Sequence, residues 1–400
     1  MLAGAAAIAL IVANTPLNQI YQEVLDFTIN IPLGQDGKYK SVLLLINDGL
    51  MAVFFLLIGL ELTREILDGE LSSRSQIVLP AFAAVGGMLV PAVIFALMNF
   101  KDPTAIKGWA VPTATDIAFA LGVLSVLGSR VPLALKVFLT ALAVLDDLGA
   151  IVVIALFYTE QLSVWMLGGA CVIVIVLLVM NLVGVARIVP YLILGLVFWV
   201  FVLKSGIHAT LAGVVLGLIV PLRTKGPEGR SPLRHLEHLL HPWVAYLILP
   251  IFAFANAGVR FGGLSEGEFP IWVAVGIAAG LFLGKQIGIT GAALIAIKCG
   301  LAKRPGNVSW GTLHGISCLC GIGFTMSLFV GNLAFKQENL PAPTIYQEPS
   351  KVVVIQSAPT EPTPPNYDSA VKIGVLGGSL ISAVLGYTLI AVGLPSSKTD

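Results

Sequence analysis

Three aspartates lie inside long apolar runs of this chain, and no other feature constrains its fold as strongly. Asp146 and Asp147 are adjacent in the middle of the run 131–158, and Asp116 lies in the run 108–128. On insertion scales, a carboxylate at the centre of a membrane helix costs roughly 2.5–3.5 kcal/mol. We therefore interpret the three carboxylates as a place inside a membrane where a cation, either a proton or a metal ion, is bound and released.

Composition predicts a polytopic membrane protein. Of the 400 residues, 57% are hydrophobic and 11% are charged, whereas about 25% of a soluble domain is charged. The net charge of +1 gives no reason to expect a nucleic-acid partner. The predicted fold is all-α, with about 12 transmembrane helices in the lipid bilayer and a single transporter domain over 1–400. The runs read as spans are 1–13 (short, and read as an incomplete first span), 42–61, 77–99, 108–128, 132–158, 163–186, 188–203, 205–221, 243–258, 271–298, 308–335 and 371–394.

Two stretches between the spans are read as external loops. An even number of spans puts both termini on one side, and a modest excess of Lys and Arg assigns that side to the cytoplasm. The external loop 14–41 contains turn residues between short β-type runs, which predicts a surface hairpin. The stretch 336–369 contains seven of the 23 prolines and is read as an extended, poorly ordered external loop.

Two of the spans carry more helix breakers than a lipid-exposed helix tolerates. Pro112 precedes Thr115 and Asp116 in the run 108–128, and five glycines interrupt the run 308–335. Unpaired backbone at membrane depth survives only inside protein or beside a water-filled cavity. We expect both spans to be discontinuous and to cross, within inverted-topology repeats formed by helices 3–5 (77–158) and 10–12 (271–394). Asp116 would then offset positive helix ends, and Lys285 negative ones. Close helix packing is the alternative for the glycines.

Five motifs, spread in order over nearly the whole chain, resemble those of the NhaA family of bacterial Na⁺/H⁺ antiporters. They are Ala-Thr-Asp-Ile-Ala-Phe-Ala-Leu-Gly (114–122), Asp-Asp-Leu-Gly-Ala (146–150), Leu-Lys-Ser-Gly-Ile-His-Ala-Thr-Leu-Ala-Gly (203–213), Leu-Glu-His-Leu-Leu-His-Pro (236–242) and Gly-Ile-Gly-Phe-Thr-Met-Ser (321–327). The resemblance implies crossed, broken helices 4 and 11 and a homodimer held partly by the external hairpin. It also implies electrogenic, pH-regulated exchange of Na⁺ or Li⁺ for protons across the bacterial inner membrane. A proline usually follows the family's helix 10 lysine, and here Gln286 stands in that place.

The resemblance also assigns ion-binding positions. By motif match, Asp147 and Asp146 take the places of the family's essential aspartate pair, Thr115 and Asp116 match polar positions on helix 4, and Lys285 matches the helix 10 lysine. Neighbouring residues on a helix differ by about 100° in direction, so Asp146 and Asp147 cannot point the same way. We expect Asp147 to bind Na⁺ and to carry protons. Asp146 would bind Na⁺ or pair with Lys285, in a role either functional or structural, and Thr115 would be a weaker Na⁺ ligand. No cofactor is expected, because Na⁺ or Li⁺ is the transported substrate.

A second group of polar residues is read as a cytoplasmic pH sensor. The resemblance implies this role for residues at the end of the second span and before the ninth, and for a histidine in the eighth. They are Glu61, Arg64, Glu65, Glu237, His238, His241 and His208. Histidine changes charge between about pH 5 and 8, which suits such a role. The alternatives are a solvated, salt-bridged helix end and, for His208, a structural hydrogen bond.

Two other functions compete with exchange. A membrane-embedded aspartyl hydrolase needs two carboxylates that face each other across a cleft, and adjacent residues cannot do so. The Gly-x-Gly-Asp motif of such enzymes is also absent from the sequence, so an enzyme is not expected. A Na⁺-coupled symporter, or another cation exchanger on the same architecture, stays open as the alternative.

Overall fold

Helices make up nearly all of the structure. The computed structural model describes residues 1–29, 40–69, 74–159, 162–224, 231–261, 269–306, 308–335, 347–348, 351–352 and 365–394. Within these residues, eight helical segments are long and apolar enough to cross a membrane. Five of the eight are continuous helices: α5 (Arg74–Asn99), α7 (Leu133–Phe157), α8 (Val164–Leu182), α9 (Ile188–Ser205) and α17 (Tyr367–Gly393).

The other three long segments each contain a π-helical turn. They are α3–η1–α4 (Val42–Leu45, Ile46–Leu50, Met51–Leu67), α11–η5–α12 (Pro232–Trp243, Val244–Ile248, Leu249–Asn256) and α13–η7–α14 (Ile271–Ala279, Gly280–Gly284, Lys285–Lys298). A π turn widens the helix locally, redirects the side chains beside it, and is frequent at functional sites. Lys285 directly follows η7, and His241 lies shortly before η5.

Two spans are broken in the places that the sequence predicts. The 3-10 helix η3 (Ala105–Thr113) and α6 (Ile117–Val126) bend by 40°, and α15 (Trp310–Leu319) and α16 (Phe324–Ala334) bend by 45°. The first break is a short extended link at Ala114 and Asp116, and the second is a short turn from Cys320 to Gly323. The order of long helix, broken pair and long helix occurs in both halves of the chain. The predicted all-α fold with two discontinuous spans is therefore confirmed. A third bend, of 112°, joins α1 (Leu2–Ala13) to α2 (Asn18–Asp26).

Two predicted boundaries were wrong by about three helical turns or less, for local reasons. The ninth span begins at Pro232 rather than near 243, because Ser231 caps the helix by accepting from the Arg234 N–H and proline is tolerated at the first position. Glu237, His238 and His241 are therefore helical and not in a loop. The eighth span is the short α10 (Thr210–Ile219), since Gly206, with a φ of 91°, ends α9 and redirects the chain.

Glycines bring pairs of helices into backbone contact beside the broken spans. A methyl group on Gly59 of α4 would lie 2.6 Å from the Val214 carbonyl oxygen of α10, and one on Gly284 would lie 2.7 Å from Pro91 Cα of α5. The hydrophobic effect does not drive helices together inside a membrane. The close packing that such contacts allow holds them together instead. These contacts fix α4 and α14, the helices that carry Glu61 and Lys285.

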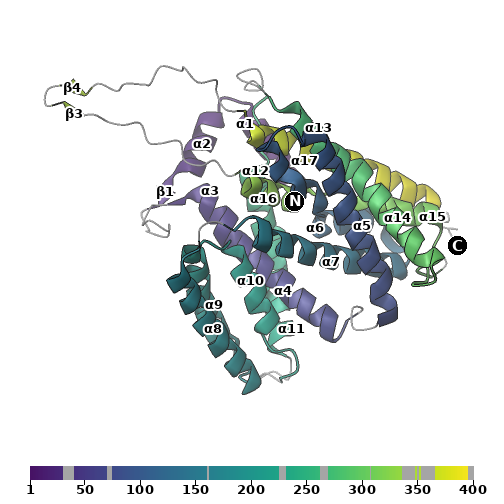
Figure 1. Ribbon diagram of the computed structural model, residues 1–400, viewed down its shortest axis with the longest axis horizontal. Helices are drawn as coiled ribbons and strands as arrows, with labels where there is room; N and C mark the ends of the chain where they lie inside the picture. The colour runs from purple at the N-terminus through teal and green to yellow at the C-terminus, as the bar shows by residue number, and fades with distance from the viewer. Residues whose placement is uncertain are drawn as a thin grey trace.

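The broken spans lie between two groups of helices. α8 and α9 lie side by side at one edge, next to α10, whereas α5, α13, α14, α15 and α17 pack together on the opposite side (Figure 1). α7 and α16 lie between the groups (Figure 1). The remaining short helix is η4 (Gly128–Arg130).

Two short ladders complete the described structure. β1 (Thr28–Ile29) pairs antiparallel with β2 (Lys40–Ser41), and β3 (Gln347–Glu348) pairs antiparallel with β4 (Lys351–Val352). The turn of the predicted hairpin, at 30–39, and most of the predicted loop 336–369 lie outside the described residues.

Candidate functional site

The links of the two broken spans meet in a region that we call the crossing (residues 113–116 and 320–325). The Asp116 N–H donates to the Ile322 carbonyl at 2.6 Å, and the Thr115 hydroxyl donates to the Cys320 carbonyl at 2.9 Å. Thr115 and Cys320 are fully buried. The links thus supply each other with the hydrogen bonds that each span lacks where its helix stops.

Asp116 closes the positive ends of two half-helices at once. One carboxylate oxygen accepts from the Phe119 N–H at 2.9 Å and so caps α6. The other oxygen accepts from the Thr325 hydroxyl at 2.6 Å and the Thr325 N–H at 3.1 Å, at the start of α16. The carboxylate therefore lies where the amide ends of both helices leave partial positive charge. Sequence reasoning missed Thr325 as the partner, although it stands in the Gly-Phe-Thr-Met-Ser motif directly after the break.

Ser379 of α17 also serves the start of α16. Its hydroxyl oxygen accepts from the Gly323 and Phe324 N–H groups, each at 3.2 Å. Gly323 has no side chain that could cap its own helix, so the cap comes from a residue 56 positions away. No pattern in the sequence singled out Ser379, because a serine on an apolar helix most often bonds its own backbone.

Lys285 lies at the negative end of the first half-helix of the broken span, η3. Its ammonium group donates to the Thr113 carbonyl at the end of η3 and to the Thr115 hydroxyl at 2.9 Å. It also lies 2.7 Å from an Asp146 oxygen, and both side chains are fully buried. The structure thus brings together three residues that the sequence singled out, Lys285, Asp146 and Thr115. The second Asp146 oxygen is buried and has no hydrogen-bond partner.

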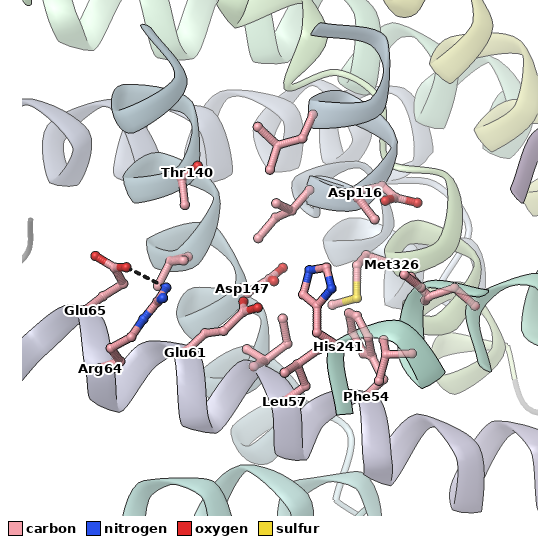
Figure 2. A pocket seen from close by; sticks show the side chains of 18 residues that line it. Phe54, Leu57, Glu61, Arg64, Glu65, Asp116, Thr140, Asp147, His241 and Met326 are labelled. Atoms are coloured by element: carbon pink, nitrogen blue, oxygen red, sulfur yellow. Dashed lines mark hydrogen bonds and ion pairs between the residues drawn. The ribbon is translucent and has the colours of Figure 1, made fainter. Parts of the chain in front are cut away.

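Asp147 points away from this ion pair, into a cavity of about 170 Å³. Its side chain lies opposite Glu61 of α4, with Asp116 and Met326 on another wall (Figure 2). Both Asp147 oxygens are buried and neither has a hydrogen-bond partner. The other oxygen donors that line the cavity include carboxylates and the Thr140 hydroxyl. Hard cations prefer such oxygen ligands.

The cavity continues to the surface through a charged mouth. Arg64, Glu65 and His241 line the cavity together with Asp147, and Arg64 pairs with Glu65 at 2.8 Å (Figure 2). Arg64 also pairs with Glu237 at 3.2 Å. A second pocket, of about 420 Å³, shares Arg64 and His241 with the first. It is lined by Arg64, Arg234, Glu237, His238 and His241. Six of the seven residues predicted as a pH sensor therefore lie along one path to Asp147.

His208, the seventh, lies elsewhere. Its Nε2 contacts the Tyr158 carbonyl, beyond the end of α7. α4 and α10 run parallel, with Gly213 against Ala52 and Gly217 against Gly59, so His208 lies beyond the end of the pair that is opposite to Arg64. From Ala52 to Arg64 alone, the helical rise amounts to roughly 18 Å. His208 therefore does not share the mouth with the other six residues.

The family model and the most similar relatives point to one family. The model of the family described as Na⁺/H⁺ antiporter 1 matches residues 1–390. The chain is 51% identical to the Na⁺/H⁺ antiporter NhaA of Pseudomonas putida (strain GB-1) over 392 residues, 98% of this chain and 94% of the relative. It is 53% identical to the Na⁺/H⁺ antiporter NhaA 1 of Syntrophotalea carbinolica over 390 residues, 98% of this chain and 92% of the relative. Among solved structures, the sodium proton antiporter MjNhaP1 from Methanocaldococcus jannaschii at pH 8 is 17% identical, with a TM-score of 0.49 and 98% of each chain covered.

Proposed function

This chain belongs to the Na⁺/H⁺ antiporter 1 family and is a Na⁺/H⁺ antiporter of the multi-pass membrane class, and we propose that it exchanges the two ions at Asp147. The observation that carries the proposal is the environment of that side chain. Both oxygens are buried at the inner end of a cavity, and no group among the described residues donates to them. A buried carboxylate without a partner is costly as an anion, so a bound proton or a bound Na⁺ must neutralise it. One group that can hold either ion, but not both, is sufficient for exchange by competition.

Glu61, Asp116 and Thr140 are the groups that help Asp147 to hold Na⁺. All three line the cavity and carry oxygen atoms. Thr115, which the sequence suggested as a weak ligand, has its hydroxyl engaged by Lys285 and by the Cys320 carbonyl. We therefore assign Thr115 to the crossing and not to the ion. Li⁺, a smaller hard cation, suits the same oxygen ligands and is proposed as a second substrate.

The Asp146–Lys285 pair couples ion binding to a charge on α14. Asp147 of the cavity and Asp146 of the pair are adjacent residues of α7, so a change of charge on one is felt by the other. Protonation of Asp146 would release Lys285, which could then lose its own proton and add a second carrier. Such groups titrate as a coupled set. Net movement of charge would make the exchange electrogenic, and the membrane potential would then drive it.

The charged mouth is proposed as the pH-regulated entry to the cavity. Arg64 bridges Glu65 of its own helix and Glu237 of α11, so the charge of the nearby His241 acts on a network that joins both walls. On the expected topology this mouth faces the cytoplasm, as do both termini, in the bacterial inner membrane. The homodimer and its hairpin contact remain proposals of the same kind.

The size of the cavity favours exchange over symport. Pockets for organic ligands measure about 300–1,000 Å³, and this cavity measures about 170 Å³. An organic cosubstrate would not fit beside the ion. Proton exchange needs no such space.

Transport in proteoliposomes tests the proposal. Vesicles are loaded with an inside-acid pH gradient that a pH-sensitive dye reports, and Na⁺, Li⁺ or K⁺ is then added. We expect Na⁺ and Li⁺, but not K⁺, to collapse the gradient in wild type. Asp147→Asn, which keeps the shape of the side chain but not its charge, should lower the rate by at least two orders of magnitude, because the shared site for the two ions is lost.

Asp68→Asn is the matched control. Asp68 pairs with Arg234 at 2.9 Å on the surface, where its side chain is 40% exposed. This variant should transport like wild type. Normal Na⁺-dependent collapse by folded Asp147→Asn protein would refute the assignment of the carrier. Collapse that requires an added organic solute would favour the symporter.

A further inference from the structure

Three asparagines from three different helices bond to one another near the centre of the molecule. Asn256 at the end of α12 and Asn47 in η1 exchange two hydrogen bonds, of 2.9 and 3.2 Å. The Asn332 side chain of α16 donates to the side-chain amide oxygen of Asn256 at 2.7 Å. Asn256 also donates to the Phe252 carbonyl at 2.9 Å, and only 2% of it is exposed. We call this group the amide latch (Asn47, Asn256 and Asn332).

The amide latch lies beyond the closed end of the Asp147 cavity. Each of its three helices also lines that cavity, and on each the asparagine is six or seven residues from a lining residue: Phe54, Leu249 and Met326. That spacing is two turns, or about 10 Å. On α4 and on α11–α12, the charged mouth is at the other end, with Arg64 and His241. The latch and the mouth therefore lie on opposite sides of Asp147.

An aromatic layer fills the space between the cavity and the latch. Phe329 of α16 contacts Phe55 of α4, with ring centroids 5.3 Å apart, and Phe252 of α12, at 6.4 Å. At most 1% of each of these residues is exposed. Phe252 and Phe329 lie between the lining residue and the asparagine of their own helices. We call these three residues the aromatic plug. Its rings pack against one another on the side of the cavity that faces the latch.

We propose that the aromatic plug and the amide latch together are the closed external gate of the antiporter, and that the three asparagines are positioning residues that hold it shut. The proposal rests on the proposed function, in which Asp147 must be reached from each side in turn. The same three helices form the cavity, the plug and the latch. A movement that closes the mouth by shifting α16 against α4 and α12 would therefore separate Asn332 from Asn256 and Phe329 from its two partners.

Amides suit a gate that opens in every cycle. A neutral amide can exchange its protein partner for water without leaving an unpaired charge in the membrane, whereas a buried ion pair cannot. The amide oxygens are also hard ligands, which can coordinate Na⁺ as it leaves. Asn47 stands in the π turn η1, which redirects its side chain from the course of a regular helix.

Reversible cross-linking tests the gate directly. Asn256→Cys and Asn332→Cys are combined in a background in which Cys171, Cys299, Cys318 and Cys320 are replaced by serine. A short bis-methanethiosulfonate reagent then joins the two thiols across the latch, and dithiothreitol removes the link. We expect the link to stop Na⁺-dependent proton exchange and dithiothreitol to restore it. Each single-cysteine variant should exchange ions at the same rate before and after treatment with the reagent. Undiminished exchange by fully cross-linked protein would overturn the proposal.

A second measurement separates gating from mere structural support. Asn332→Ala removes one hydrogen bond of the closed gate, so the apparent KM for Na⁺ should rise about two- to tenfold on the mouth side and fall on the other. Inside-out and right-side-out vesicles report the two sides. The control is Asn99→Ala, since Asn99 is a buried asparagine that bonds the Phe95 and Trp272 carbonyls away from the latch. It should leave the ratio of the two KM values unchanged. An unchanged ratio in Asn332→Ala would leave the latch a purely structural contact and contradict the gate.

Failure of the gate and failure of the proposed carrier have different signatures. If folded Asp147→Asn still exchanges ions but the cross-link arrests it, the gate stands and the carrier is another group. If the cross-link has no effect while Asp147→Asn is inactive, the carrier stands and the gate does not.

Discussion

Asp146 and Asp147 are neighbours on one helix with opposite surroundings. Asp146 lies 2.7 Å from Lys285 in a fully buried pair, whereas Asp147 has two buried oxygens without any partner. The helix alone accounts for the difference, since a step of one residue turns the side chain by about 100°. One carboxylate meets the crossing and the other meets the cavity. The same side chain is therefore held by a partner in one position and left open to an ion in the next.

The same contrast holds for the regions around them. In the crossing, Asp116, Thr115 and Lys285 satisfy half-helix ends through several hydrogen bonds. In the cavity, Asp147 accepts none. A polar group that the protein satisfies adds to stability, and a group that it leaves unsatisfied is free to bind an ion from solution. Substitutions in the crossing should therefore change stability first, and substitutions in the cavity should change transport first.

The largest expected effect on stability comes from Lys285→Ala. It leaves Asp146 and the Thr113 carbonyl without their donor in the membrane interior. Breaking a buried pair from one side costs about 3–5 kcal/mol, so the free energy of unfolding in mixed detergent micelles should fall by about that amount. Asp147→Asn, measured in the same way, should change it by less than about 1 kcal/mol, because no protein bond is lost.

The double variant Asp146→Asn/Lys285→Met sharpens the contrast. Removing both partners leaves no unpaired charge, so much of the lost stability should return. If Lys285→Ala and Asp147→Asn reduce stability equally, the division between a structural and a transporting aspartate is wrong.

Thr325→Val tests the crossing with a smaller change. The substitution removes the hydroxyl that donates to Asp116 at 2.6 Å and keeps the volume of the side chain. A hydrogen bond to a charged group contributes about 1.5–3 kcal/mol, and we expect a loss of stability in that range. Chemical unfolding of wild type and variant measures it. Unaltered stability combined with lost transport would move Thr325 from the crossing to the ion path.

The smallest effect distinguishes two serines on α17. The Ser379 hydroxyl accepts from two N–H groups at the start of α16, whereas the Ser382 hydroxyl is buried without a partner. Loss of a helix cap costs about 0.5–2 kcal/mol, so Ser379→Ala should lower the melting temperature. Ser382→Ala should leave it unchanged or raise it slightly. Equal melting temperatures for the two variants would contradict the role of Ser379 as the cap of the second broken span.

The sequence predicted those parts of the site in which a residue departs from a strong local pattern. A carboxylate in an apolar run and a proline beside Thr115 and Asp116 break a strong pattern, and they predicted the buried aspartates and the broken spans correctly. It failed where the surroundings are ordinary. Thr325, Ser379 and the asparagines of the amide latch look like tolerated polar residues on apolar helices. His208 was grouped with the pH sensor by motif, but it lies far from the other six residues.

The sequence by itself determined that this chain lies in a membrane, that two of its spans break, and that three aspartates are buried within its spans. These properties follow from the cost of each residue in hydrocarbon, which depends on the residue and its neighbours along the chain. Only the tertiary structure decided which carboxylate is paired and which is unpartnered, which serine caps a helix, and which asparagines meet beyond the cavity. Those outcomes depend on directions and distances between helices that are far apart in sequence, because a buried polar group is costly or harmless according to the partner that packing brings to it.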